Sequence, residues 1–279
     1  MTEPGAKNLD SSLFDLSRKV VLVTGAAGIQ GVRLTRGLAA FGASIAAADI
    51  DGEAVTKLCL EIEEEYDVRT LPVKCDVSSQ DDVRSMVAYV VDTLGAIDVL
   101  HNNAQGRPDD IASFFAPVED FSFDVWRSIM AVNLDGVFLV AQAVGKHMIE
   151  RGNGGSIIQV ASTYGLVGSD PGLYEGSHYM GQRMNTPAVY SASKAAIVGL
   201  TRYLATNWAP HNIRVNTLVP GGIESGQNET FKANYATRTP LGRMAHRDEM
   251  VGAVVYLASD ASSYMTGQMM VVDGGWTAW

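Results

Sequence analysis

The sequence feature that most constrains the fold is a short apolar run that ends in three closely spaced glycines. Residues 19–24 read Lys-Val-Val-Leu-Val-Thr, and Gly25, Gly28 and Gly31 follow at once. From residue 32 to residue 41, apolar side chains recur at the spacing of one helix face. A buried strand, a glycine turn and a helix in this order present backbone N–H groups to the pyrophosphate of a dinucleotide. The sequence therefore predicts a nucleotide-binding α/β fold.

A carboxylate stands at the end of the next apolar run. Residues 43–48 predict a second strand, and Asp49 follows it, 18 residues after the last of these glycines. A carboxylate there accepts hydrogen bonds from the ribose hydroxyls and repels a 2′-phosphate, so it favours NAD over NADP. Neither Ile50 nor Asp51 supplies a cation for that phosphate. The alternative is that Asp49 only opens the following turn.

Strands and helices alternate through the rest of the chain. Because parallel strands need long crossover connections, which are usually helices, this alternation predicts one doubly wound parallel sheet of seven strands, a Rossmann fold of the α/β class. The further strands are expected at residues 70–75, 97–101, 156–161, 213–219 and 269–272, and the further helices at 53–65, 79–94, 123–151, 189–208 and 248–257.

The composition fits one such domain. The chain has 279 residues, of which 47% are hydrophobic and 28 are glycine, and no linker divides it. We expect an N-terminal extension at residues 1–18 and a single Rossmann-fold domain at 19–279. Within it, residues 164–188 form a long insertion, and residues 224–240 are expected to form a mobile flap.

Charge and cysteine content exclude several classes of function. The net charge of −10 argues against nucleic acid and anionic membranes as partners. Cys59 and Cys75 support neither a disulfide framework nor a metal site, and the histidines lack metal-ligand spacing, so we expect no metal. Residues 1–12 lack the apolar core of a signal peptide, and no run approaches the length of a membrane span. A cytoplasmic location is expected.

Polar residues recur where predicted strands end, which is where open α/β sheets bind ligands. Asp76 follows the third strand, where it contacts adenine or only caps a turn. Ser162 follows the fifth strand, either as a reactive group or as a turn residue. Asn133 interrupts an apolar helical pattern, which indicates a bend in the helix or a functional amide.

Tyr190 and Lys194 are four residues apart in the predicted helix 189–208, so their side chains share one face. A cation beside a phenol favours the phenolate, and lowering the tyrosine pKa from about 10 by about two or three units would make it a proton carrier near neutral pH. The spacing alone arises by chance roughly one time in four, so a surface pair is the alternative. The helix is apolar nearly all round, which predicts that a neighbouring subunit covers it.

Taken in order, these pieces resemble the short-chain dehydrogenase/reductase family, in its single-domain branch, from about Lys19 to Gly275. The resemblance implies a nicotinamide cofactor, interconversion of an alcohol and a carbonyl on a small molecule, and a homotetramer. It is carried by the glycine turn, residues 102–104, Asn133, Ser162, Tyr190 with Lys194, residues 220–221 and residues 273–275.

The resemblance also implies roles for these residues. Tyr190 would be the general acid/base, and Lys194 would lower its pKa and bind the nicotinamide ribose. Ser162 would hydrogen-bond the substrate oxygen, and Asn133 would hold a water in a proton relay. The implied contacts with NAD are Gly25, Gly28, Ile29, Gly31, Asp49, Ile50, Asp76, Val77, Asn103, Tyr190, Lys194, Pro220, Gly221, Ile223 and Ser225.

The chain departs from the family pattern in three places. The single-domain branch usually has its second glycine where Ile29 stands, and a glycine where Gln105 stands. The insertion at residues 164–188 is longer than usual and rich in hydrogen-bonding groups, which favours a sugar, polyol or related polar substrate. Packing or subunit contact is the alternative role for this insertion. The candidate substrate contacts are Gln105, Tyr164, His178 and Arg183.

Three functions remain open from the sequence. The favoured one is NAD-dependent interconversion of a secondary alcohol and a ketone. A 3-oxoacyl reductase acting on an acyl carrier or coenzyme A thioester is the second. A catalytically silent NAD(H)-binding sensor is the third, although it would need only the glycine turn, Asp49 and Asp76, and not the set of residues around Tyr190.

Overall fold

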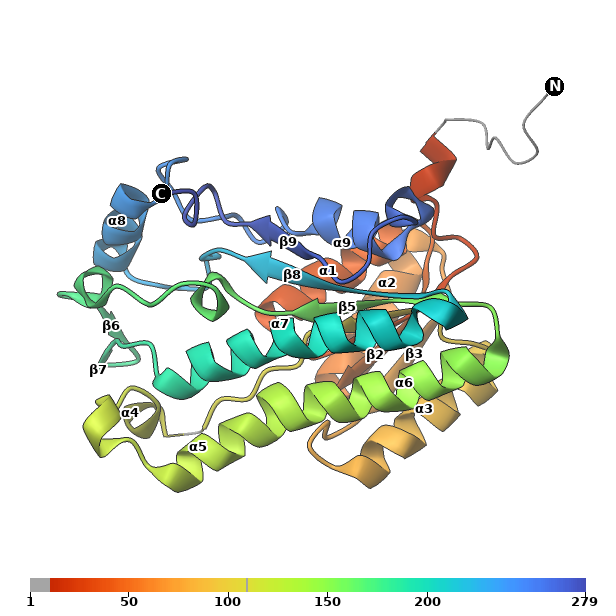
Figure 1. Ribbon diagram of the computed structural model, residues 1–279, viewed down its shortest axis with the longest axis horizontal. Helices are drawn as coiled ribbons and strands as arrows, with labels where there is room; N and C mark the ends of the chain where they lie inside the picture. Colours follow the sequence, from red (N-terminus) through yellow and green to blue (C-terminus); the bar gives the residue numbers. More distant parts are fainter. Residues whose placement is uncertain (1–10, 109) are drawn as a thin grey trace.

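A parallel sheet of seven strands forms the centre of the computed structural model, which describes residues 11–108 and 110–279 (Figure 1). The strand order is β3-β2-β1-β4-β5-β8-β9, so the order reverses between β1 and β4. The predicted doubly wound sheet is confirmed, and its central strands β1 and β4 are buried on both faces, as their continuous apolar runs predict. The strands are β1 (Val20–Thr24), β2 (Ser44–Asp49), β3 (Thr70–Lys74), β4 (Val99–Asn102), β5 (Gly155–Val160), β8 (Ile213–Pro220) and β9 (Met269–Val272).

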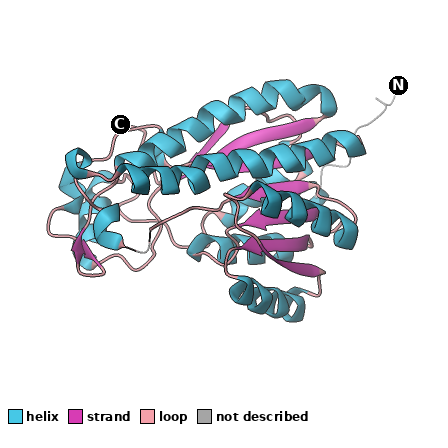
Figure 2. Ribbon diagram, turned by 90° about the horizontal axis from the view of Figure 1, so that it is seen from below, coloured by secondary structure: helices cyan, strands magenta, loops and turns pink. Residues whose placement is uncertain are grey.

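Helices cover both faces of this sheet (Figures 1 and 2). One hydrophobic core lies between the sheet and α1, α2 and α9, and a second lies between the sheet and α3, α6 and α7. Every predicted strand and helix overlaps an observed one. The bounds are α1 (Ile29–Ala40), α2 (Gly52–Tyr66) and α9 (Val251–Ala258) on one face, and α3 (Gln80–Leu94), α6 (Val137–Arg151) and α7 (Ala188–Trp208) on the other.

Several short elements lie in segments predicted to be loops. The expected flap contains α8 (Glu229–Arg238), which begins where the Asn228 side chain accepts a hydrogen bond from the Phe231 N–H. The insertion contains a small hairpin of β6 (His178–Tyr179) and β7 (Gln182–Arg183). The turn α4 (Ile111–Phe114) follows β4. All three lie at the end of the sheet toward which the strands point (Figure 1).

The predicted interruption near Asn133 is a π-helical segment, Ala131–Gly136, between α5 (Phe123–Met130) and α6. This continuous stretch corrects the expectation that no run approaches a membrane span. Its length and its mean hydropathy of 1.5 would allow it to cross a membrane. However, Val140, Val144 and Met148 are buried in the core against the sheet, and the core helix of a globular domain passes the same length and hydropathy test.

The start of the domain also lies earlier than residue 19. Leu16 is fully buried, and its N–H donates to the carbonyl of Phe41 after α1. The first ten residues of the expected extension lie outside the described part of the chain. Cys59 and Cys75 are both buried free thiols.

His101, in the middle of β4, is fully buried in the layer beneath α1 and α9. Neither ring nitrogen has a hydrogen-bond partner among residues 11–108 and 110–279. Burial lowers the pKa of His101 from 6.5 to about 4, because the apolar surroundings disfavour the charged ring.

Stability is therefore expected to fall as the pH drops from about 6.5 toward about 4, since the unfolded chain binds a proton at His101 that the folded chain does not. The full loss from this group is on the order of 3 kcal/mol. Urea unfolding at pH 7 and pH 5 should show a smaller pH difference for His101→Leu than for the wild type. The exposed histidine His211 provides the control, and an unchanged slope in His101→Leu would contradict the assignment.

Candidate active site

In the turn after β1, two positions require glycine, and they require it for different physical reasons. Gly25 has a φ of +64°, a conformation that residues with a Cβ rarely adopt. Gly31 lies in the first turn of α1, and a Cβ there would sit 2.0 Å from the carbonyl oxygen of Gly25. Gly28 precedes the helix with an ordinary φ of −68°, and its Cβ would lie 3.3 Å from the same oxygen. Gly25 and Gly31 thus allow the turn to lie close to the N-terminus of α1, while the conformation and surroundings of Gly28 would tolerate a Cβ more easily.

The ends of β2 and β4 support this turn. The Asp49 carboxylate accepts hydrogen bonds from the Ala27 N–H at 3.0 Å and from the Asp51 N–H at 3.1 Å. The amide of Asn103 donates to the carbonyl oxygens of Thr24 and Gly25. Asp49 therefore lies beside the glycine turn, as predicted, and also shapes the turn that follows β2.

Other predicted cofactor residues occupy less direct positions. Asp76 accepts hydrogen bonds from the backbone and the hydroxyl of Ser78, so the turn-capping alternative is present in the structure. The side chain of Val77 packs in the core against Gly136, which leaves its backbone for any ligand contact. Ile50 is exposed, and its aliphatic side chain has no hydrogen-bonding group to offer a cofactor. Ile29, where the family usually has glycine, is also exposed.

Asn133 connects the loop after β4 to α7. Its Oδ1 accepts a hydrogen bond from the Gly106 N–H at 2.8 Å, and its Nδ2 donates to the hydroxyl of Ser193 at 3.5 Å. Ser193 in turn donates to the carbonyl of Tyr190. Gly106 is not among the residues predicted from the sequence, although a Cβ there would come within 2.9 Å of Val132 and hinder this approach.

The first turns of α7 bring Tyr190 and Lys194 to the end of β5. Lys194 is buried, and its Nζ donates to the Val160 carbonyl at 3.0 Å and lies 5.8 Å from the centre of the Tyr190 ring. Ser162 lies two residues after the end of β5 and is buried, and its hydroxyl interacts with Tyr190. The structure therefore brings these three predicted catalytic residues together.

The electrostatics of the pair differ from the prediction. Burial raises the pKa of Tyr190 above its ordinary value near 10, and the Ser162 hydroxyl partly opposes this rise. Burial also lowers the pKa of Lys194 from 10.5 to about 8. The predicted lowering of the Tyr190 pKa is not produced by the chain's own groups, because the loss of hydration is the largest effect on the buried phenol.

The predicted substrate residues fall into two groups. Tyr164, two residues after Ser162 and the first residue of the insertion, packs against the aromatic cluster that includes Tyr174, and a hydrogen bond of 3.2 Å joins the hydroxyls of these two tyrosines. His178 and Arg183 instead pair with each other across the exposed hairpin β6–β7. Gln105 is exposed on the loop after β4.

Arg107, which the sequence analysis did not select, joins this loop to the insertion. Its guanidinium donates to the hydroxyl of Tyr179 at 3.3 Å, and the Tyr179 ring meets Phe115 edge to face. The segment after β4 and the hairpin therefore lie side by side at the end of the sheet.

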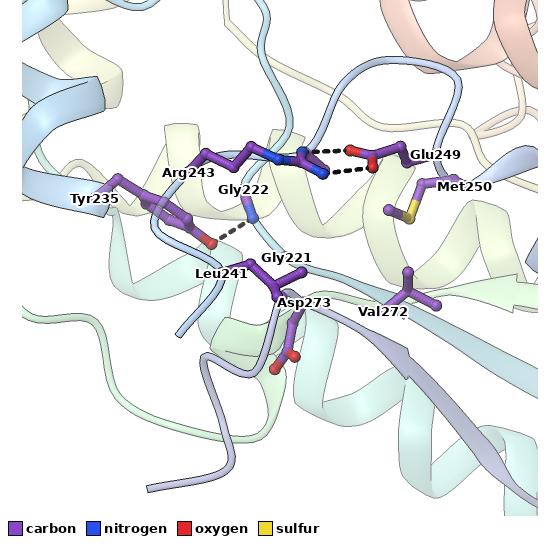
Figure 3. Close-up of a pocket in the computed structure, with 11 residues that line it drawn as sticks. Gly221, Gly222, Tyr235, Leu241, Arg243, Glu249, Met250, Val272 and Asp273 are labelled. Atoms are coloured by element: carbon purple, nitrogen blue, oxygen red, sulfur yellow. Dashed lines mark hydrogen bonds and ion pairs between the residues drawn. The ribbon is translucent and has the colours of Figure 1, made fainter. Parts of the chain in front are cut away.

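The segment after β8 packs against α8. The Gly222 N–H donates to the Tyr235 hydroxyl at 2.5 Å, and the Tyr235 ring stacks on Trp276 with centroids 4.6 Å apart. Beside Gly221 and Gly222 lies a cavity of about 210 Å³ (Figure 3). The ion pair of Arg243 with Glu249 and the aromatic ring of Tyr235 border it (Figure 3).

The remaining predicted residues of this segment are held by local contacts. Pro220 ends β8 opposite Val272, and Ile223 forms a bridge with Ala245. The Ser225 N–H donates to the side chain of Gln227 at 2.7 Å. In the described part of the chain, no group of three His, Cys, Asp or Glu residues could hold a metal ion.

Comparison with known proteins identifies this arrangement. A family model described as enoyl-(acyl carrier protein) reductase matches residues 25–277. Gluconate 5-dehydrogenase of Gluconobacter oxydans is 36% identical over 273 residues, which cover 95% of this chain and 97% of that protein. The chain belongs to the short-chain dehydrogenase/reductase family. A second member, 3-oxoacyl-[acyl-carrier-protein] reductase of Thermotoga maritima, is 38% identical over 269 residues, covering 93% and 98% of the two chains.

Solved structures of the family agree with the fold. A gluconate 5-dehydrogenase from Burkholderia cenocepacia, in complex with NADP and tartrate, matches with a TM-score of 0.83 and 35% identity over 96% of this chain and 98% of that chain. A short-chain dehydrogenase from Leptospira borgpetersenii with bound NAD+ matches with a TM-score of 0.83 and 31% identity, covering 98% of each. The present chain, as a member of the family, is an oxidoreductase that acts on CH–OH groups and binds a nicotinamide cofactor.

Proposed function

We propose that the protein is a nicotinamide-dependent dehydrogenase of a polyol or sugar acid, with NAD preferred over NADP. The observation that carries the proposal is that Ser162, Tyr190 and Lys194 lie together at the end of β5. The insertion that follows Ser162 adds the hydrogen-bonded hydroxyls of Tyr164 and Tyr174. The names of the related gluconate 5-dehydrogenases support a hydroxyl-rich substrate.

The residues of the turn fit a dinucleotide. The close contact of Gly31 with Gly25 leaves no space for a Cβ, and no side chain caps the N-terminus of α1. The open N–H groups of this helix would hold the pyrophosphate, and Asp49 would hold the adenosine ribose. Lys194 would bind the nicotinamide ribose, and the backbone of residues 220–223 would face the nicotinamide.

Tyr190 is the proton carrier in the proposed reaction. Oxidation of a carbinol removes a hydride from carbon and a proton from oxygen. When bound, an oxidised nicotinamide would supply the hydride acceptor and a positive charge in the site. Tyr190, as a phenolate, takes the hydroxyl proton, while Ser162 hydrogen-bonds the same oxygen and orients it. In the reverse direction, Tyr190 returns the proton to the carbonyl oxygen.

Lys194 and Asn133 have supporting roles. The buried Lys194 ammonium is held by the Val160 carbonyl and stabilises negative charge on Tyr190. The π-helical segment points Asn133 at α7, where its amide reaches Ser193. We assign it to a water-mediated proton relay that recharges Tyr190.

The cofactor preference is testable at Asp49. Asp49→Asn keeps an acceptor for the Ala27 N–H but removes the charge that repels a 2′-phosphate. The ratio of the dissociation constants of NADPH and NADH is expected to fall roughly tenfold. Asp51→Asn, which removes the same charge two residues away, should leave the ratio unchanged. An equal ratio in Asp49→Asn and the wild type would contradict the preference for NAD.

A 3-oxoacyl reductase is the second candidate. It is favoured by the description of the matching family model and by the Thermotoga maritima relative. The polar insertion favours the polyol substrate instead, because an acyl chain would need apolar surface there. A silent NAD(H) sensor is the weakest reading, since such a protein would not need the buried Lys194 beside Tyr190.

A substrate panel separates these candidates. NADH formation would be followed at mildly alkaline pH with D-gluconate and other sugar acids, with tetritols and pentitols, and with 3-hydroxyacyl thioesters. Turnover confined to the first two groups supports the proposal, and turnover confined to thioesters replaces it with the second candidate. Tight NADH binding without any turnover would favour the sensor.

We also propose a homotetramer, because α7 exposes a face suited to a second copy of the chain. This face has small residues at Ala192, Ala195 and Gly199, with exposed Tyr203 and, on α6, exposed Phe138. Such a surface loses water favourably against another subunit. Sedimentation at micromolar concentration should give a mass of about four chains, and a monomer would contradict the proposal.

A further inference from the structure

The backbone of Gly222, just after β8, is held on both sides by other segments of the chain. Its N–H donates to the hydroxyl of Tyr235 in α8 at 2.5 Å (Figure 3). Its carbonyl accepts a hydrogen bond from the N–H of Ala245 at 2.9 Å. A Cβ on Gly222 would lie 2.5 Å from the Tyr235 ring, so only glycine lets α8 approach this closely. Tyr235 and Ala245 therefore fix the orientation of this part of the backbone.

This backbone leaves the sheet at the same place as the catalytic residues. β8 runs parallel to β5, with Leu218 opposite Val160. The Val160 carbonyl accepts a hydrogen bond from the Nζ of Lys194 at 3.0 Å, and Ser162 follows two residues later. Because neighbouring parallel strands end at the same edge of a sheet, residues 220–223 begin beside Lys194 and Ser162.

The hydroxyl of Tyr235 has a defined place because its ring is packed on two sides. The ring is buried, stacks on that of Trp276 with centroids 4.6 Å apart, and lies 6.0 Å from that of Phe231. Trp276 is itself tied to the end of β9, since its N–H donates to the carbonyl of Asp273. The position of Gly222 is therefore set jointly by α8 and by the C-terminal residues.

We infer that Tyr235 is a positioning residue for the nicotinamide half of the cofactor: through Gly222 it holds the backbone of residues 220–223 in the conformation that binds the nicotinamide carboxamide. A carboxamide carries both hydrogen-bond donors and an acceptor, which a fixed backbone can match with its own C=O and N–H groups. The inference rests on the proposed placement of the nicotinamide at residues 220–223, and it extends the cofactor site to α8.

The two halves of the cofactor are expected to depend on Tyr235 differently. Binding of the nicotinamide and docking of α8 stabilise each other, because the same hydrogen bond serves both. The adenosine and the pyrophosphate are held elsewhere, by Asp49 and the glycine turn after β1. ADP-ribose, which lacks only the nicotinamide, should therefore bind independently of Tyr235.

Tyr235→Phe, titrated with a matched pair of ligands, tests the inference. The variant keeps the aromatic ring and its stack on Trp276 and loses only the hydroxyl that holds Gly222. Calorimetric titration should show NADH binding weakened roughly 3- to 10-fold, the effect of one net hydrogen bond, and ADP-ribose binding unchanged. Tyr89→Phe removes an exposed phenol hydroxyl from α3 and should leave both affinities as in the wild type.

Hydrogen exchange of the backbone amides in α8 gives a second readout. In the wild type, NADH should slow exchange over residues 229–238 several-fold more than ADP-ribose does, because only NADH contacts the segment that is bonded to Tyr235. In Tyr235→Phe the two ligands should slow this exchange equally.

Two results would overturn the inference. Equal weakening of NADH and ADP-ribose binding in Tyr235→Phe would mean that the hydroxyl serves only the fold. No change in either affinity would mean that residues 220–223 need no support from α8. Neither measurement uses a substrate, so NADH binding that depends on Tyr235, in a protein that oxidises no polyol in the substrate panel, would reject the proposed substrate alone.

Discussion

Replacing Tyr190 with phenylalanine is expected to lower kcat by about 10²- to 10⁴-fold, the usual contribution of a positioned general acid/base. The ring would still fill its place at the start of α7, and Lys194 would still be held by the Val160 carbonyl. The dissociation constant of NADH should therefore change little. Steady-state kinetics on the substrate found in the panel, together with NADH fluorescence titration, measure the two quantities separately.

Tyr203→Phe is the matched control for this variant. It removes a phenol hydroxyl from the same helix, but on the exposed face away from the sheet. It should leave kcat unchanged. If Tyr190→Phe retains turnover within a factor of about ten, the tyrosine carries no proton in the rate-limiting step and the proposed mechanism is wrong.

Gly31→Ala is expected to be the most damaging single-methyl change in the cofactor turn. The new Cβ would lie 2.0 Å from the Gly25 carbonyl oxygen and 2.8 Å from backbone atoms of Ala26, and backbone cannot move aside as a flexible side chain can. Overpacking of this kind costs about 3 kcal/mol or more of folding stability. It should also weaken NADH binding by more than about tenfold, because the turn and the N-terminus of α1 must separate.

Gly28→Ala is the control for this variant. It tests whether the damage to stability and NADH binding depends on the position of the glycine, or whether the loss of any glycine in the turn has the same effect. Its Cβ would meet the same oxygen at 3.3 Å, from a backbone conformation that alanine adopts freely. It should fold with nearly normal stability by urea denaturation and bind NADH within a few-fold of the wild type. Equal damage in both variants would refute the distinction between the two glycines.

The sequence predicted the sheet well because most of its strands are buried on both faces. Such strands must be continuously apolar, so residues 19–24 and 213–219 could be found without knowing their neighbours. The helix α8 could not, because it is polar over most of its surface and lies where the chain suggests a flap. Its stability comes from Phe231 and Tyr235 packing on the insertion and on Trp276, a contact between segments distant in sequence.

In the candidate site, too, some features could be predicted from the local sequence and others could not. Ser162, Tyr190 and Lys194 could be placed because each is fixed by its position at the end of a strand or the start of a helix. The pKa direction of Tyr190 could not, since it depends on how completely the folded chain removes water from the phenol. The hydrogen bond between Tyr174 and Tyr164 could not be predicted either, because it depends on where the insertion folds back.

The aromatic cluster of Tyr174, Phe231, Tyr235 and Trp276 joins three segments that are distant in sequence: the insertion, α8 and the C-terminal residues. None of the three can swing away without breaking contacts made by the other two. Any opening of this end of the molecule is then one cooperative event, and the free energy of separating these rings sets how rarely it occurs.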